Sequence, residues 1–171
     1  GAGLHRQKLP GGFEAAANGD TVELGPFSVT FFSVSHDAAD PSGFLIRAGG
    51  VSVGIATDLG KAGALLVQTL GGCNGLVLEF NHDLDMLWDG PYPWPLKQRI
   101  SSGLGHMSND DGAELLSRLA HPELKVCVLA HLSRENNTPE LAMASAVRVA
   151  EDRFTLLAGS RHAALPSIQV V

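Results

Sequence analysis

The sequence predicts a single domain of the α/β class (α+β type), built as a sandwich of sheets with helices outside. Two observations predict it. In the first third, apolar segments flank the turn signals Gly25-Pro26 and Gly49-Gly50, which is typical of two antiparallel hairpins. After about residue 60, apolar runs alternate with helical patterns. With 171 residues, the chain fits one domain that spans residues 1–171.

The expected elements follow in chain order. The two hairpins contain strands over 21–24 and 27–34, then 43–48 and 51–57. A short helix is expected over 61–70, followed by a buried strand over 76–80. Three prolines at alternate positions of 90–95 predict an extended, irregular segment.

The second half carries clear helix-start signals. Ser108 and Asp111 form a capping box, and Thr138 followed by Pro139 starts a helix that runs to about residue 152. Strands are expected at 125–130, 154–158 and 167–171.

Composition excludes several classes of protein. Hydrophobic residues at 44% and charged residues at 18% exclude a disordered chain, and no apolar run is long enough to span a membrane. Cys73 and Cys127 are interpreted as unpaired thiols in a reducing cytoplasm, so we predict a cytoplasmic protein without a Cys-based zinc site. The net charge of −6 argues against a protein that coats nucleic acid, but not against a nuclease whose metal ions face the phosphate.

Three expected strands end in an imidazole or a carboxylate: His36, Asp58 and His131. Each has a simpler interpretation when taken alone, because a histidine at a strand end is commonly a surface residue and Asp58 could cap the next helix. Together they favour a divalent metal site, since imidazoles and a bridging carboxylate on rigid elements suit a binuclear centre.

Two further histidines are candidates. His106 precedes a helix N-terminus, which suits a general acid or a phosphate contact; alternatively it only leads into the helix. His82 is interpreted as a supporting or structural residue that Glu79 could orient.

Polar residues near these positions could contact a substrate. Lys97 and Arg99 follow Trp94, a combination that suits base stacking and phosphate binding, although aromatics that cover the core with solvated charges beyond them are the simpler interpretation. Arg134 and Asn136 follow His131 and could add polar contacts.

These phrases together resemble the metallo-β-lactamase-fold hydrolases, and within them the YycJ/WalJ branch. The motifs that carry the resemblance are Ser35-His36-Asp37-Ala-Ala-Asp40-Pro41, Ala56-Thr57-Asp58-Leu59-Gly60, Glu79-x-Asn81-His82-Asp83, Gly90-Pro-Tyr-Pro-Trp-Pro-Leu-Lys97, Gly105-His106-Met-Ser108-Asn109 and Ala130-His131-Leu-Ser133-x-Glu135-Asn136-Asn137.

The resemblance implies an αβ/βα sandwich with two divalent metal ions, zinc or manganese, at one edge of the sheets. His36 would bind one metal, Asp58 would bridge both and His131 would bind the other. His106 would lie near the scissile phosphate, at the mouth of the site. The implied activity is 5′→3′ exonuclease action on double-stranded DNA.

One family motif, His-x-His-x-Asp-His, does not occur in the chain. We therefore expect these residues to be the C-terminal two-thirds of the domain, inactive alone, with no metal or one weakly bound ion. An uncovered sheet face would pair two copies or receive the missing N-terminal segment. Two alternatives stay open: a small-molecule metallo-hydrolase acting on a thioester or cyclic phosphate, and a non-catalytic interaction module.

Overall fold

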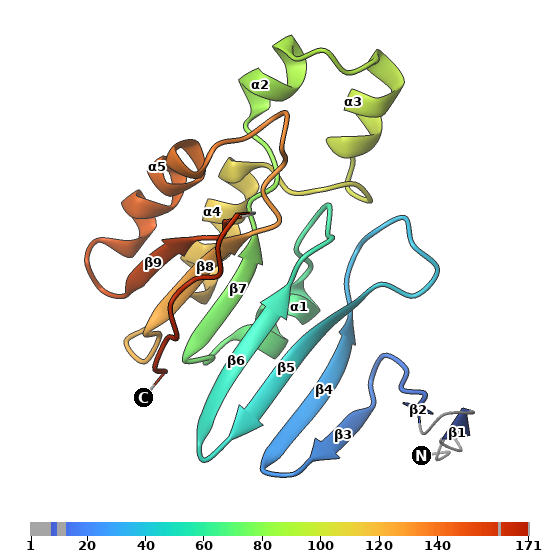
Figure 1. The fold of residues 1–171 in the computed structure, drawn as a ribbon, viewed down its shortest axis with the longest axis vertical. Helices are drawn as coiled ribbons and strands as arrows, with labels where there is room; N and C mark the ends of the chain where they lie inside the picture. Colours follow the sequence, from blue (N-terminus) through green and yellow to red (C-terminus); the bar gives the residue numbers. More distant parts are fainter. Residues whose placement is uncertain (1–7, 10–12, 161, 171) are drawn as a thin grey trace.

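The chain folds around one seven-stranded sheet (Figure 1). The computed structural model describes residues 8–9, 13–160 and 162–170. Four strands form an antiparallel half, in the order β3 (Thr21–Leu24), β4 (Phe27–Ser33), β5 (Ser42–Ala48) and β6 (Val51–Ala56). The sheet continues in parallel with β7 (Gly75–Glu79), β8 (Val126–Ala130) and β9 (Thr155–Ala158). A separate two-stranded sheet joins β1 (Lys8–Leu9) to β2 (Phe13–Glu14).

This topology brings five strand ends to one edge. Strands β4 and β6 both pair antiparallel with β5, so they run in the same direction as each other and as β7, β8 and β9. Side chains that follow these five strands therefore gather along a single edge of the sheet. The hairpin turns required for this arrangement are the predicted ones, and Gly49 and Gly50 both have positive φ values.

Three helices cover one face of the sheet: α1 (Ala64–Leu70), α4 (Asn109–Leu119) and α5 (Pro139–Ala150). Alternate strand residues such as Leu76 and Leu78 point into this layer, where they join helix residues such as Leu116 in one buried cluster. Each fully buried leucine stabilises the fold by about 1.5–3 kcal/mol relative to exposure. This core holds the strand ends rigidly.

The opposite face of the sheet is only half-buried. A row of paired residues crosses six strands there: Phe31, Phe44, Ile55, Val77, Val128 and Leu157. Part of the face is covered by the C-terminal segment, because a Cβ built on Gly75 would lie 3.3 Å from Val170. Residues 167–170 form no strand, so the predicted strand at 167–171 is wrong over its described part. The described residues contain one large sheet rather than two facing sheets.

Two short helices that the sequence did not predict stand beyond the edge (Figure 1). They are α2 (Leu84–Asp89), capped by the Asp83 carboxylate, and α3 (Trp94–Ile100). The prediction of irregular structure over 90–95 is therefore wrong for its last two residues. Pro95 is tolerated because it lies in the first turn of α3, where its missing N–H has no helical partner to lose.

The remaining predictions agree with the structure to within a few residues. Ser108 and Asp111 form the predicted capping box of α4, and Thr138 caps α5. Helix α1 begins at Ala64 rather than at residue 61. Cys73 and Cys127 are both buried free thiols. Within the described residues, no helix has the length and apolar character needed to cross a membrane.

Candidate metal centre

The shared edge brings five titratable residues together. Asp58 comes two residues after β6, Glu79 ends β7 and His131 directly follows β8. His36 lies in the loop after β4, and His106 lies between α3 and α4. Residues 21 to 95 positions apart in the sequence thus come together because their strands are neighbours in the sheet.

The geometry of this cluster suits cation binding. The His106 ring lies between the other two imidazoles, with ring centroids 5.0 Å from His36 and 5.1 Å from His131. His131 Nε2 is 3.7 Å from Asp58 Oδ1. Two sets of potential ligand atoms lie within 4.8 Å of one another: His36 with Asp58 and His106, and Glu79 with His106 and His131. Imidazole nitrogens and carboxylate oxygens are donors that first-row divalent metals accept.

Two of these residues have unusual backbone conformations. Asp58 has φ 55° and His131 has φ 57°, so both are left-handed although neither is glycine. Aspartate and histidine tolerate this region better than most residues, yet it still costs free energy that the surrounding structure must offset. Such residues concentrate at functional sites. The left-handed step turns the chain sharply at the ends of β6 and β8.

Buried Glu79 holds two histidines of the cluster in place through hydrogen bonds. Its side chain is fully buried, and Oε1 accepts hydrogen bonds from His106 Nδ1 at 2.7 Å and from His131 Nδ1 at 2.9 Å. Oε2 accepts the Leu59 N–H at 2.6 Å. Burial alone would raise the pKa of Glu79, but the hydrogen bonds from His106, His131 and the Leu59 N–H outweigh it and hold the pKa below 4.5. Glu79 is therefore ionised at neutral pH.

An ionised carboxylate only accepts hydrogen bonds, so both histidines must donate from Nδ1. Nε2 is then the unprotonated nitrogen of each neutral ring, and it is the atom that can bind a metal. His36 follows the same rule with a different partner, because its Nδ1 lies 3.0 Å from the Gly105 carbonyl oxygen. A backbone or carboxylate acceptor thus fixes the tautomer of all three imidazoles.

The structure places His106 and His82 in different surroundings. His106 is a member of both potential ligand groups, and its side chain is 21% exposed. His82 is buried outside the cluster, and neither ring nitrogen has a hydrogen-bond partner among the described residues. Glu79 therefore orients His106 and His131, and the expectation that it orients His82 is wrong. Burial lowers the pKa of His82.

The predicted substrate-contact residues have partners within the chain. Lys97 is buried, and its Nζ donates to the Trp88 carbonyl oxygen at 2.5 Å, which ties α3 to α2. Arg99 Nε donates to Asp37 Oδ2 at 2.5 Å, and this bond holds the pKa of Asp37 below its ordinary value. Of these two side chains, Arg99 is 62% exposed and can still meet a phosphate. The Lys97 ammonium group is instead bonded within the chain.

The two remaining candidates differ from each other. The Arg134 side chain is 80% exposed, with Nε 3.5 Å from Glu135 Oε1. Asn136 is buried, and its backbone carbonyl oxygen accepts the Asp83 N–H, which joins the loop after β8 to the start of α2. Neither end of its side-chain amide has a hydrogen-bond partner among the described residues.

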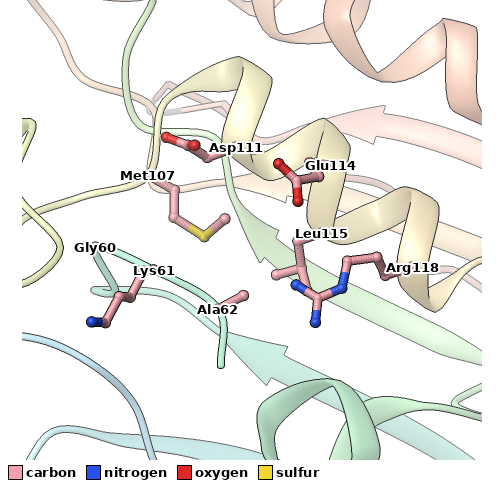
Figure 2. Close-up of a pocket in the computed structure, with 8 residues that line it drawn as sticks. All are labelled: Gly60, Lys61, Ala62, Met107, Asp111, Glu114, Leu115 and Arg118. Atoms are coloured by element: carbon pink, nitrogen blue, oxygen red, sulfur yellow. The ribbon is translucent and has the colours of Figure 1, made fainter. Parts of the chain in front are cut away.

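A pocket of about 150 Å³ lies next to the cluster but contains none of its residues (Figure 2). It separates the loop after β6 from α4, with Lys61 on one side and Asp111, Glu114 and Arg118 on the other. Its lining includes two basic and two acidic side chains, so their formal charges balance.

Comparison with known proteins supports the fold and the resemblance. The chain is 38% identical over 135 residues to exodeoxyribonuclease YycJ of Bacillus anthracis, an alignment that covers 79% of this chain and 51% of that protein. It is 40% identical over 124 residues to exodeoxyribonuclease WalJ of Streptococcus pneumoniae, covering 72% of this chain and 46% of that protein. The chain is a relative of the YycJ/WalJ proteins. No protein-family model matches it.

Solved structures confirm the fold class. The metallo-β-lactamase fold protein YhfI of Bacillus subtilis superposes with a TM-score of 0.62 at 17% identity, covering 82% of this chain and 49% of that one. Zn²⁺-bound PqqB of Methylobacterium extorquens superposes with a TM-score of 0.56 at 19% identity, covering 84% of this chain and 49% of that one. The chain has the metallo-β-lactamase fold, and it spans about half the length of the curated relatives it matches.

Proposed function

We propose that the protein to which this chain belongs is a metal-dependent phosphodiester hydrolase, acting as a 5′→3′ exonuclease on double-stranded DNA. The observation that carries the proposal is the cluster at the sheet edge, in which buried Glu79 fixes the tautomers of His106 and His131. The exodeoxyribonuclease names of the relatives support the substrate class.

In this proposal, His36 and His131 would hold divalent metal ions through Nε2, and the Asp58 carboxylate would be shared between the ions. Bound zinc or manganese would supply an activated water and offset charge on the phosphate. Asp58 is half-exposed at the tip of β6, so its second oxygen can also face a ligand. The donor set and its spacing fit this role.

His106 has two possible roles in the same reaction. Its Nδ1 donates to Glu79, which leaves Nε2 to face the cluster. In the role we propose, His106 passes a proton from Nε2 to the leaving oxygen. Replacing His106 with Ala separates the roles: a general acid would lower turnover and keep the metal content, whereas a ligand would lose metal.

We further propose that the present 171 residues are inactive alone and hold no metal or one weakly bound ion. The three proposed ligands His36, Asp58 and His131 are too few for two cations. The half-buried face of β4 to β9 would be covered by the preceding half of the domain, or by a second copy of the chain. Metal analysis and light scattering of the 171-residue chain would contradict this proposal if they showed a monomer with two stoichiometric metals.

The experiment for the whole protein compares duplex DNA, single-stranded DNA, structured RNA and a thioester, with added Mn²⁺ or Zn²⁺. We expect release of nucleotides from 5′ ends of duplex DNA. Asp58→Asn should abolish it, since asparagine tolerates the left-handed backbone but cannot bridge two cations as an anion. Asp152→Asn is the matched control, because Asp152 is exposed and also left-handed, with φ 60°. Preferential thioester hydrolysis would contradict the nuclease proposal.

A further inference from the structure

The sheet edge that carries the candidate metal-binding residues also borders a second pocket. His131, at the end of β8, belongs to the candidate metal-binding cluster, and the next three residues line this pocket of about 220 Å³. Strand β9 supplies the other wall, because Gly159 and Ser160 follow its last residue. The lining consists of Leu132, Ser133, Arg134, Asn137, Pro139, Gly159, Ser160 and His162.

The hydroxyl groups of this pocket are placed as donors. Ser133 Oγ accepts the Asn136 N–H at 3.2 Å. Ser160 Oγ accepts the N–H groups of His162 and Ala163 at 3.1 and 3.3 Å. Each oxygen already accepts from the backbone, and neither hydroxyl proton has an acceptor within the described part of the chain. Both O–H groups are therefore available to an acceptor in the pocket.

The wall behind these hydroxyls is held rigidly. Asn137 donates to the Phe80 carbonyl oxygen and exchanges hydrogen bonds with Asn109 through both ends of its amide. Its Oδ1 also accepts the Thr138 N–H. Both ends of the Asn137 side-chain amide are therefore hydrogen-bonded within the chain. These bonds fix the wall of the pocket and leave no side-chain oxygen of Asn137 for a cation.

The charge of the pocket favours an anion. Arg134 and His162 line it, and none of the described lining residues is acidic, although the chain carries a net charge of −6. Arg134 Nε has a long, exposed contact of 3.5 Å with the carboxylate of Glu135, the next residue in the chain. Exposed ion pairs are weak, so a phosphate held by the hydroxyls can compete for the guanidinium.

We propose that this pocket binds a terminal phosphate monoester of the nucleic acid substrate. This proposal rests on the proposed function. Neighbouring strands lie about 4.8 Å apart, and successive nucleotides rise by about 3.4 Å along each strand of duplex DNA. A phosphate held between β8 and β9 is therefore one or a few nucleotides from a scissile phosphate at the cluster. Holding the end phosphate would place the terminal linkage at the metals and make the enzyme act from strand ends.

The test compares DNA duplexes that differ only at one end, with full-length protein and Mn²⁺. The four ends are 5′-phosphate, 5′-hydroxyl, 3′-phosphate and 3′-hydroxyl, and free inorganic phosphate serves as a competitor. We expect kcat/KM to be roughly tenfold higher for the 5′-phosphate than for the 5′-hydroxyl, which is the effect of one charge-assisted hydrogen bond. Inorganic phosphate should inhibit hydrolysis of the 5′-phosphate duplex more strongly than hydrolysis of the 5′-hydroxyl duplex. Equal rates on all four ends would overturn the proposal without using any variant.

Variants then locate the effect. Ser160→Ala and His162→Gln should reduce the preference for the 5′-phosphate by roughly tenfold, mainly through KM. Ser117→Ala is the matched control, because Ser117 is an exposed residue of α4 that lies outside the pocket. Unchanged end preference in both pocket variants would place the phosphate elsewhere and overturn the proposal.

A small diester keeps the two proposals distinguishable. Bis(p-nitrophenyl) phosphate has no terminal phosphate and reports the metal cluster directly. No hydrolysis of it by wild-type protein would contradict the proposed function. Hydrolysis of it together with equal rates on all four DNA ends would leave the function standing and overturn the subsite. An equal loss on DNA and on the small diester in the pocket variants would show damage to the metal cluster and would also overturn the subsite.

Discussion

Replacing Glu79 with glutamine should weaken metal binding while preserving the shape of the side chain. The buried carboxylate accepts hydrogen bonds from His106 and His131 on one oxygen and from Leu59 on the other. Glutamine has one acceptor oxygen and one donor NH₂ group. If its oxygen faces the imidazoles, its NH₂ opposes the Leu59 N–H; if it turns over, both imidazoles lose their acceptor.

The magnitude follows from these contacts. A hydrogen bond to a charged group contributes about 1.5–3 kcal/mol, so the metal-free protein should lose at least that free energy of unfolding. Without the carboxylate, the imidazoles can protonate Nε2 instead of Nδ1, and Nε2 is the nitrogen that would bind metal. Losing a supporting partner of a metal ligand costs roughly 10–100-fold in metal affinity.

The assay is a competition titration of Zn²⁺ and Mn²⁺ against a chromogenic chelator, with full-length protein, together with urea unfolding of the metal-free form. Glu114→Gln is the control, because Glu114 is exposed on α4 and has no ion pair among the described residues. Wild-type metal affinity in Glu79→Gln would refute the role given to this carboxylate. A loss of stability with unchanged affinity would show that Glu79 supports the fold alone.

Three further outcomes follow from the structure. Gly60→Ala should destabilise the protein by about 1–3 kcal/mol in urea unfolding, because its Cβ would lie 2.5 Å from backbone atoms of residues 102 and 103. Gly63→Ala meets no atom within 4 Å and should change stability by less than about 0.5 kcal/mol. Lys97→Met should cost about 1.5–3 kcal/mol by urea unfolding, since it removes the buried bond to the Trp88 carbonyl; an unchanged stability would restore Lys97 as a candidate phosphate contact. Because the pKa of Glu79 is lowered from 4.5 on folding, its stabilisation is present above pH 4.5 and is lost as pH falls through the lower folded value. Circular dichroism from pH 6 to pH 2 should show a smaller acid loss in Glu79→Gln than in the wild type.

Local signals in the sequence were sufficient for most of the fold. The glycine turns at residues 25 and 49–50 and the caps at Ser108 and Thr138 act within a few residues, so they could be recognised without tertiary structure. Helix α3 was missed because the proline spacing resembled an extended segment, and α2 was missed although Asp83 caps it. Proline in the first turn of a helix is compatible with either interpretation.

The sequence by itself determined that His36, Asp58 and His131 follow strands, and parallel strands that are neighbours in a sheet end at the same edge. It could not determine which side chain Glu79 would contact. Glu79 bonds to residues 27 and 52 positions away, and such contacts depend on how β7 packs between β6 and β8. The same holds for Lys97, whose charge suggested a phosphate contact. In the structure, α3 packs against α2 and the Lys97 ammonium group is bonded to the Trp88 carbonyl oxygen. Tertiary structure decided these roles because the partners of a buried polar group come from distant parts of the chain.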